Sequence, residues 1–563
     1  MKKLLVVLLL VAVGVGAYQF LGGSKDMERL DYVPADTVLL SAQMKPLNMT
    51  AYLASMGMQP GQYDQFGQVF DEMMQDENDP ASKFGLAIFN GFFEAVAAPE
   101  TFVSTTGMKD AQRSLVYFVG VSPVMHFELD SEEQFLSFFS DAQVSSGITY
   151  ADKTIEGVAY TSYLLDEELG LELLVRAADG WGVMTFHAAE FDDEHLKLSL
   201  AVTKPKNPIT GSEIYSKMFG EYKMSKDGIG FISTQEIGKM LTTVDGNSIA
   251  KDIGVLGDGE IAREFEMLRT PECKADVDML TAMWPGMFID TTINQSSGKS
   301  LNIDGRVLIP TSSKVAKDGL KALRGFLPNY ATDNKSMLSV ALGLDVSALS
   351  SSVSSMWSAA SNMSLSCEPL LALQAEMQQN NPTGAFAMAG VANGFYGVAA
   401  AINEFEFDMS GEGATSLDAV VSVSAENIQA LYASLQTFVP FLAQQPLPAE
   451  GEVLNMADVV PMLSQFGVEV FAKASDEHLV LYAGEAGTVQ AESVLSEGLT
   501  QNGMNALKID YGKFFEQMLP IMQMSGQPIP PELEGMLDTK MVVSMSTDVD
   551  DTGIVFTTTM QMD

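Results

Sequence analysis

His187 and His195 are the residues whose types and spacing come nearest to a metal site. They lie eight residues apart, and the acidic run 192–194 stands directly before the second of them. Imidazole and carboxylate groups together are common ligands of zinc. The acidic run also suits the first turn of a helix, where negative side chains meet the positive end of the helix dipole. This second interpretation is favoured, and the two histidines remain metal candidates.

Methionine is a second possible source of ligands, because the chain has 35 of them, and Met518, Met522 and Met524 lie in one apolar stretch. Thioether sulfur prefers Cu(I), so such clusters suit exported proteins that handle copper. Methionine is also a flexible filler of cores and of adaptable apolar binding surfaces. Because the cluster lies in an expected helix, core packing is the favoured interpretation. An adaptable groove and copper binding are the alternatives.

Cys273 and Cys367 are the only cysteines. In an oxidising compartment two lone cysteines often form a disulfide bond. Such a bond would close a loop of about 100 residues, which corresponds to roughly 4–5 kcal/mol in the chain-entropy model. The alternative is a pair of separate buried thiols, since a sequence gives no distance between them.

The chain shows no set of residues that identifies an enzyme. It lacks the Gly-x-Ser-x-Gly, His-Glu-x-x-His and Cys-x-x-Cys motifs, whose spacing brings nucleophiles or metal ligands together. Gly298-Lys299-Ser300 ends like a phosphate-binding loop, but Ile293 stands where that loop needs its first glycine. We therefore expect no catalytic residues and no cofactor. A hydrolase whose triad is assembled from distant residues is kept as a third possibility.

The charge of the chain excludes some partners. With 73 acidic and 32 basic residues, the formal net charge is -41. A surface of this sign repels nucleic acid and anionic lipid headgroups over a Debye length. The acidity suits either a general gain in solubility or a surface for cations and basic partners. A nucleic-acid partner is not expected.

The N-terminus has the pattern of an export signal. Two lysines precede an uncharged apolar run, and the small residues at positions 15–17 suit a cleavage site. Residues 4–23 are also long enough to remain as a single membrane anchor. The sequence therefore predicts a signal or anchor over residues 1–24. It places the rest of the chain in the periplasm or cell envelope, either secreted or tethered to the inner membrane.

The sequence contains two parts whose segments match each other in order. Residues 169–187 match 466–484 without a gap, in apolar positions and in the Gly-x-Glu step. Three further matches follow in similar order: 90–93 with 393–396, 114–122 with 416–424, and 229–241 with 506–519. A duplicated unit explains this pattern better than a short solenoid repeat. The predicted halves are residues 31–311 and 325–563.

Local patterns predict the fold class of each half. Alternating apolar residues predict strands, Asp179-Gly180 predicts a hairpin turn, and Asp345 is an expected helix N-cap. Glu172 and Arg176 are expected to form an ion pair on an exposed sheet face, and Glu469 and Lys473 match them in the second half. The prediction is an α+β protein of two tandem homologous halves. Each half is a mostly antiparallel sheet with helices on one face.

The opening Pro34-Ala35-Asp36-Thr37 strand, which follows an export signal and precedes repeated strand–helix–hairpin units, resembles a group of uncharacterised bacterial envelope proteins. The resemblance implies an exported α+β protein and carries no catalytic residues. The leading hypothesis is a non-enzymatic binding or scaffolding protein of the envelope. Its partner would be an envelope protein or a lipid-like ligand, held on a free sheet face or in a cleft. The alternative is a periplasmic protein that handles copper or zinc.

Overall fold

The computed structural model divides the chain into two compact units. It describes residues 27–49, 52, 73, 77–295, 300–333, 335–407, 414–438, 447–459, 468–524 and 540–562. Unit 1 comprises the described residues up to Leu301 together with Ser366–Pro369, and unit 2 comprises Asn302–Leu365 and the described residues from Leu370 onward. The expected signal or anchor, residues 1–24, lies outside the described residues. Among the helices that are described, none is long and apolar enough to cross a membrane.

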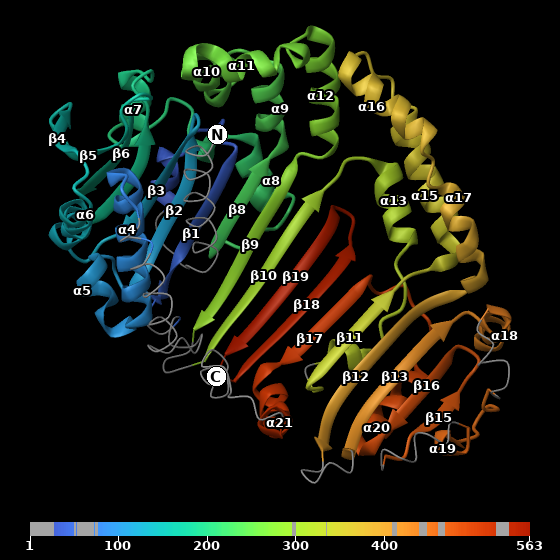
Figure 1. Cartoon of the computed structure of the whole chain (residues 1–563). Coiled ribbons are helices and arrows are strands. Elements are labelled where there is room, and N and C mark those ends of the chain that lie inside the picture. Colours follow the sequence, from blue (N-terminus) through green and yellow to red (C-terminus); the bar gives the residue numbers. More distant parts are fainter. Residues whose placement is uncertain are drawn as a thin grey trace. The chain divides into compact units, whose positions relative to one another are not determined.

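Unit 1 is built on one antiparallel sheet (Figure 1). Its strands are β1 (Leu39–Asn48), β2 (Ala111–Val119), β3 (Ser122–Glu128), β4 (Tyr150–Ile155), β5 (Val158–Asp166), β6 (Leu171–Ala178), β7 (Trp181–His187), β8 (Gly228–Ser233) and β9 (Gly286–Gln295). They lie side by side in the order β4–β5–β6–β7–β3–β2–β1–β8–β9. Asp179 and Gly180 both have positive φ in the β6–β7 turn, which confirms the predicted hairpin.

Helices cover both faces of this sheet. They are η1 (Met27–Tyr32), α4 (Pro80–Ala97), η2 (Pro99–Thr101), α5 (Phe102–Thr106), α6 (Glu132–Ser146), α7 (Asp193–Ser199), η3 (Ile209–Gly211), α8 (Glu213–Gly220), α9 (Thr234–Thr242), α10 (Ser248–Val255), η4 (Leu256–Gly259), α11 (Glu260–Glu264), η5 (Glu266–Leu268) and α12 (Pro271–Met283). In α6, Phe135 fills the space that the missing Cβ of Gly182 leaves open. Leu200, which ends α7, packs against Leu174 on the opposite face of the sheet.

Unit 2 repeats this construction with shorter strands at one edge, where β14 and β15 have two and four residues. Its strands are β10 (Leu301–Pro310), β11 (Leu338–Gly343), β12 (Phe395–Phe407), β13 (Ala414–Ala425), β14 (Leu454–Asn455), β15 (Phe471–Ala474), β16 (His478–Ala483), β17 (Asn505–Asp510), β18 (Met541–Val549) and β19 (Gly553–Met562). The order across the sheet is β14–β15–β16–β13–β12–β11–β17–β18–β19–β10.

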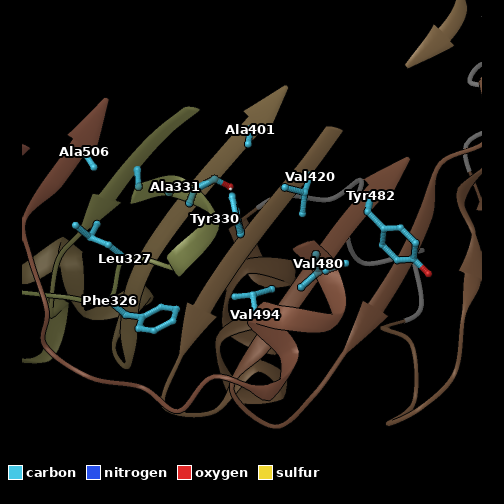
Figure 2. Packing of buried hydrophobic residues seen from close by; sticks show 13 residues of the cluster. Phe326, Leu327, Tyr330, Ala331, Ala401, Val420, Val480, Tyr482, Val494 and Ala506 are labelled. Carbon is cyan, nitrogen blue, oxygen red and sulfur yellow. Dashed lines mark hydrogen bonds between the residues drawn. The ribbon is translucent and has the colours of Figure 1, made fainter. Parts of the chain in front are cut away.

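The main core of unit 2 lies on one face of that sheet. The helices of the unit are α13 (Lys314–Ala322), α14 (Asn329–Thr332), α15 (Val346–Ser361), α16 (Glu368–Gln379), α17 (Thr383–Phe386), η6 (Ala387–Ala392), α18 (Ile428–Phe438), α19 (Met456–Val459), α20 (Gly484–Ser496) and α21 (Tyr511–Met524). Figure 2 shows Tyr330 of α14 and Val494 of α20 meeting Val420 and Val480 of the sheet. As predicted, Asp345 caps α15 by accepting from the backbone N–H of Ala348.

The α+β class and the antiparallel sheets are therefore as predicted, while the helices lie on both faces of the sheets and not on one. In unit 2, α18 packs on the face opposite α20, where Leu431 belongs to a cluster with Val423 and Leu479. Both alternating sets of residues in the strands are rich in apolar side chains, so both faces can hold helices.

The two units have the same strand order, with β1, β2, β3, β6, β7, β8 and β9 standing where β11, β12, β13, β15, β16, β17 and β18 stand. Two of the four sequence matches fall on equivalent elements, namely β6–β7 with β15–β16 and β8–α9 with β17–α21. The other two matches fall on elements that are not equivalent. Residues 114–122 lie on β2, whereas 416–424 lie on β13. Residues 90–93 lie in a helix, whereas 393–396 lead into a strand. Common ancestry of the halves stays a prediction.

Candidate functional site

The structure brings His187 and His195 together, with ring centroids 5.8 Å apart. His195 is already occupied: its Nε2 lies 3.1 Å from the carbonyl oxygen of Val119 and 3.2 Å from Asp252 Oδ2, and its Nδ1 lies 3.3 Å from Ser199 Oγ. Both of its ring nitrogens thus have protein partners. This histidine fixes α7 to the sheet.

His187 has no such network. Its Nδ1 is buried and has no hydrogen-bond partner, and burial lowers the pKa of the imidazole to about 4. Across the part of the chain that the structure describes, no three His, Cys, Asp or Glu side chains converge on a point where a metal ion would sit. The two histidines therefore form an aromatic contact, and the Asp252 carboxylate beside His195 does not complete a metal-binding group with them.

The methionine candidates lie in α21, which contacts β12, β17 and β18. Met518 is half-buried along this helix. Met522 and Met524 lie in its last turn, and their side chains are outside the described part of the structure. The helix lies against the sheet, and the role of its methionines stays a prediction.

The charged residues of the two matched hairpins form ion pairs and hydrogen bonds with other residues than the sequence predicts. Glu172 pairs with Lys153 at 2.6 Å, and Arg176 donates to the backbone oxygens of Leu200 and Ala201. The expected Glu172–Arg176 ion pair is therefore wrong. Residues four apart on a strand are separated by about 13 Å, so neighbouring strands and helices supply the partners. In unit 2, Lys473 likewise pairs with Glu492 of α20.

Cys273 and Cys367 form a disulfide bond. Cys273 lies in the first turn of α12, and Asp276 of the same helix accepts hydrogen bonds from the backbone N–H groups of Ser366 and Cys367. All of these residues belong to unit 1. The bond fastens the short segment Ser366–Pro369 to α12.

Two serine–histidine pairs, which sequence reasoning missed, bear on the hydrolase hypothesis. Ser424 Oγ lies 2.8 Å from His478 Nδ1, while His478 Nε2 lies 2.8 Å from the carbonyl oxygen of Glu497. Ser199 and His195 make the other pair. In each pair both side chains are buried. A nucleophile must reach its substrate, and these hydroxyls lie under helices, so the pairs serve the packing of α20 and α7.

An exposed apolar surface lies on the face of the unit 2 sheet opposite the core of Figure 2. We call it the open face. The strand registers place its side chains in two adjacent rows that run across β13, β12, β11, β17, β18 and β19: Val421, Ala400, Val340, Leu507, Met545 and Thr558 in one, and Val423, Val398, Leu342, Asn505, Thr547 and Phe556 in the other.

The exposure of this surface is unusual for a sheet. Val340, Leu342 and Met545 are 51%, 48% and 47% exposed, and Val398, Val421 and Phe556 are exposed as well. Among the described strand residues of unit 1, only one large apolar side chain is exposed, that of Tyr150 on the edge strand β4. Isolated apolar side chains are normal on a surface, whereas adjoining ones that form a larger patch are typical of interaction surfaces.

The band is limited on one side and at one end. Val543, in the row next to Met545, is only 8% exposed, and α21 contacts the same strand. Val423, at the β13 end of the second row, already packs against the cluster of α18. The open face is therefore bounded on one side near α21 and at its β13 end by α18.

Unit 1 has different side chains at the equivalent positions. Ser41 of β1 pairs with β2 and β8 as Val340 of β11 pairs with β12 and β17, and Gln43 stands where Leu342 stands. On β8, Gly230 faces Ser41, whereas Leu507 faces Val340. The apolar strip is thus a property of unit 2 and not of the shared strand order.

Comparisons with known proteins add no further assignment: no family model, no curated protein sequence and no solved structure matches this chain.

Proposed function

We propose that this chain is a non-enzymatic binding or scaffolding protein of the bacterial envelope, and that it binds a partner on the open face of unit 2. The observation that carries the proposal is the continuous exposure of Val340, Leu342 and Met545 with their neighbours. The export pattern of residues 1–24 supports a place outside the cytoplasm.

The size of the strip sets the strength of binding. Its exposed apolar area is on the order of 400 Å², which is that of a functional patch on a monomer. At about 25 cal/mol per Å², covering it would contribute roughly 10 kcal/mol before the cost of association. Since association itself costs several kcal/mol, the expected partner binds with modest affinity.

Site-specific photo-crosslinking in intact cells tests this proposal. A photoreactive phenylalanine derivative replaces Leu342 on the open face, and in the control it replaces Val489, which is 67% exposed on α20. We expect discrete adducts from position 342 that are absent from position 489. Equal labelling at both positions, or none at 342, would contradict a binding role for this face.

A further inference from the structure

The shape of the open face carries information about what it binds. The strip crosses six strands, from β13 to β19. With strands about 4.8 Å apart it is roughly 24 Å long, and two rows of side chains make it about 10 Å wide. An α-helix has this width, and about 16 residues of helix have this length.

The net charge of the chain sets a second requirement for the partner. The chain carries a formal net charge of -41, so a partner approaching any of its surfaces gains from positive charge and loses from negative charge. Anionic lipid headgroups and other acidic proteins are disfavoured on this ground. A partner with apolar side chains along one stripe and basic side chains beside it satisfies both conditions.

A second copy of this chain is the most obvious competitor, and the open face does not suit it. An area on the order of 400 Å² per partner is about half of the roughly 800 Å² that a stable interface buries on each side. Each copy would also bring the same charge of -41 to the contact. The strip is both too small and too repulsive for a homodimer.

We infer that the open face of unit 2 is a docking site for a basic amphipathic helix of a partner protein, which lies across the strands with its apolar stripe over Val340 and Leu342. This inference rests on the proposed function and specifies its partner. On the other face of the sheet the molecule already packs the apolar side of a helix in this way, since Ala491 and Val494 of α20 lie in the core.

The test uses the exported full chain and a synthetic probe. The probe is a labelled peptide of about 18 residues, a length that spans the strip at 1.5 Å per residue, with leucines at helical spacing and lysines on its other face. Two control peptides have the same composition in an order without an apolar stripe, or glutamate in place of lysine. Fluorescence anisotropy measures their dissociation constants over a range of salt concentrations.

Protein variants separate the strip from general charge attraction. The double variant Val340→Ser/Leu342→Gln gives unit 2 the side chains that unit 1 has at these positions. Its matched control is Val489→Ser, which removes an exposed valine elsewhere in the same unit. We expect the double variant to weaken binding of the amphipathic peptide at least tenfold, and the control to leave it unchanged. The two control peptides should bind at least tenfold more weakly to the unaltered chain.

Three outcomes would overturn the inference. Equal binding of the peptide without an apolar stripe would show attraction by charge alone. Dimerisation in sedimentation velocity that the double variant abolishes would make a second copy the occupant. Binding of single-chain lipid, and not of peptide, that the double variant abolishes would make acyl chains the occupant. In the last case the proposed function would stand, whereas photo-crosslinking without adducts at position 342 would remove the proposed function as well.

Discussion

In unit 1, Ser41 and Gln43 of β1 lie on the face of the sheet that Val340 and Leu342 of β11 occupy in unit 2. Gln43 is 7% exposed, while Val340 and Leu342 are about half exposed. The strand orders around them are the same. A polar side chain, Gln43, is thus buried in unit 1 where the apolar Leu342 faces solvent in unit 2, which reverses the usual pattern. Strand order alone therefore does not tell which face of a sheet leaves apolar side chains exposed.

A sheet face covered by helices should lose more stability than the open face when apolar side chains are removed. Phe135 of α6 is 0% exposed and lies against Gly182 and the ring of Phe139. We expect Phe135→Ala to lower the free energy of unfolding of unit 1 by about 3–5 kcal/mol, because a large cavity remains. Denaturant unfolding followed by Trp181 and Trp284 of unit 1, with Trp357 as the reporter of unit 2, measures it. An equal loss in the unit 2 signal would contradict the division into two units.

The disulfide bond has both cysteines in unit 1, but residues 302–365 of the loop that it closes belong to unit 2. Its cysteines are separated by 94 positions, and closing a loop of that order stabilises a chain by roughly 4–5 kcal/mol. We expect Cys273→Ser/Cys367→Ser to lower the unfolding midpoints of both units, because the loop that it frees in the unfolded chain contains residues of both. Unfolding with and without a reductant is the independent check, since the double variant should no longer respond to it.

Buried histidines should make unit 1 sensitive to acid. Burial lowers the pKa of His126 to about 3 and that of His187 to about 4, from 6.5 in an open chain. Well above pH 6.5 both are neutral in the folded and unfolded states. Between pH 6.5 and 4 the unfolded chain binds protons that the folded chain excludes, so stability falls as the pH falls.

The variant His187→Phe measures this effect. Its ring keeps the contacts with Phe191 and His195 but takes up no proton. We expect the variant to be about 2 kcal/mol more stable than the unaltered chain at pH 4, relative to their difference at pH 7.5. Unfolding midpoints across this range test it, and parallel curves for the two proteins would rule out titration of His187 as a cause.

Local signals made part of the fold predictable. The Asp179-Gly180 turn and the Asp345 cap depend on residues within three positions of each other, and both are confirmed. The order of strands depends on pairing between distant segments, and short matches such as 114–122 with 416–424 were misleading about it. The sequence around Met337–Leu344 has apolar residues on both alternating sets. Such a strand is expected to be buried on both faces, so the exposure of one face needed the structure.

Local sequence signals likewise predicted only part of the candidate sites. The number of cysteines and the expected compartment left a disulfide bond and two separate thiols as alternatives, and the structure shows the bond between Cys273 and Cys367. Glu172 and Arg176 were misjudged, because their spacing along one strand did not reveal Lys153 or the end of α7 as partners. The Ser424–His478 pair joins residues on two strands, and no motif in the sequence announces it.

The smallest expected change in stability is that of the double variant on the open face, and this change tests the contrast between the two units directly. Val340→Ser/Leu342→Gln changes side chains that are half exposed and belong to neither of the two hydrophobic clusters described for the unit 2 sheet. We expect the free energy of unfolding of unit 2 to change by less than about 1 kcal/mol, followed through Trp357. A loss as large as that of Phe135→Ala in unit 1 would mean that the chain itself covers this face in solution. A small change, together with lost peptide binding, separates the role of these residues in recognition from any role in folding.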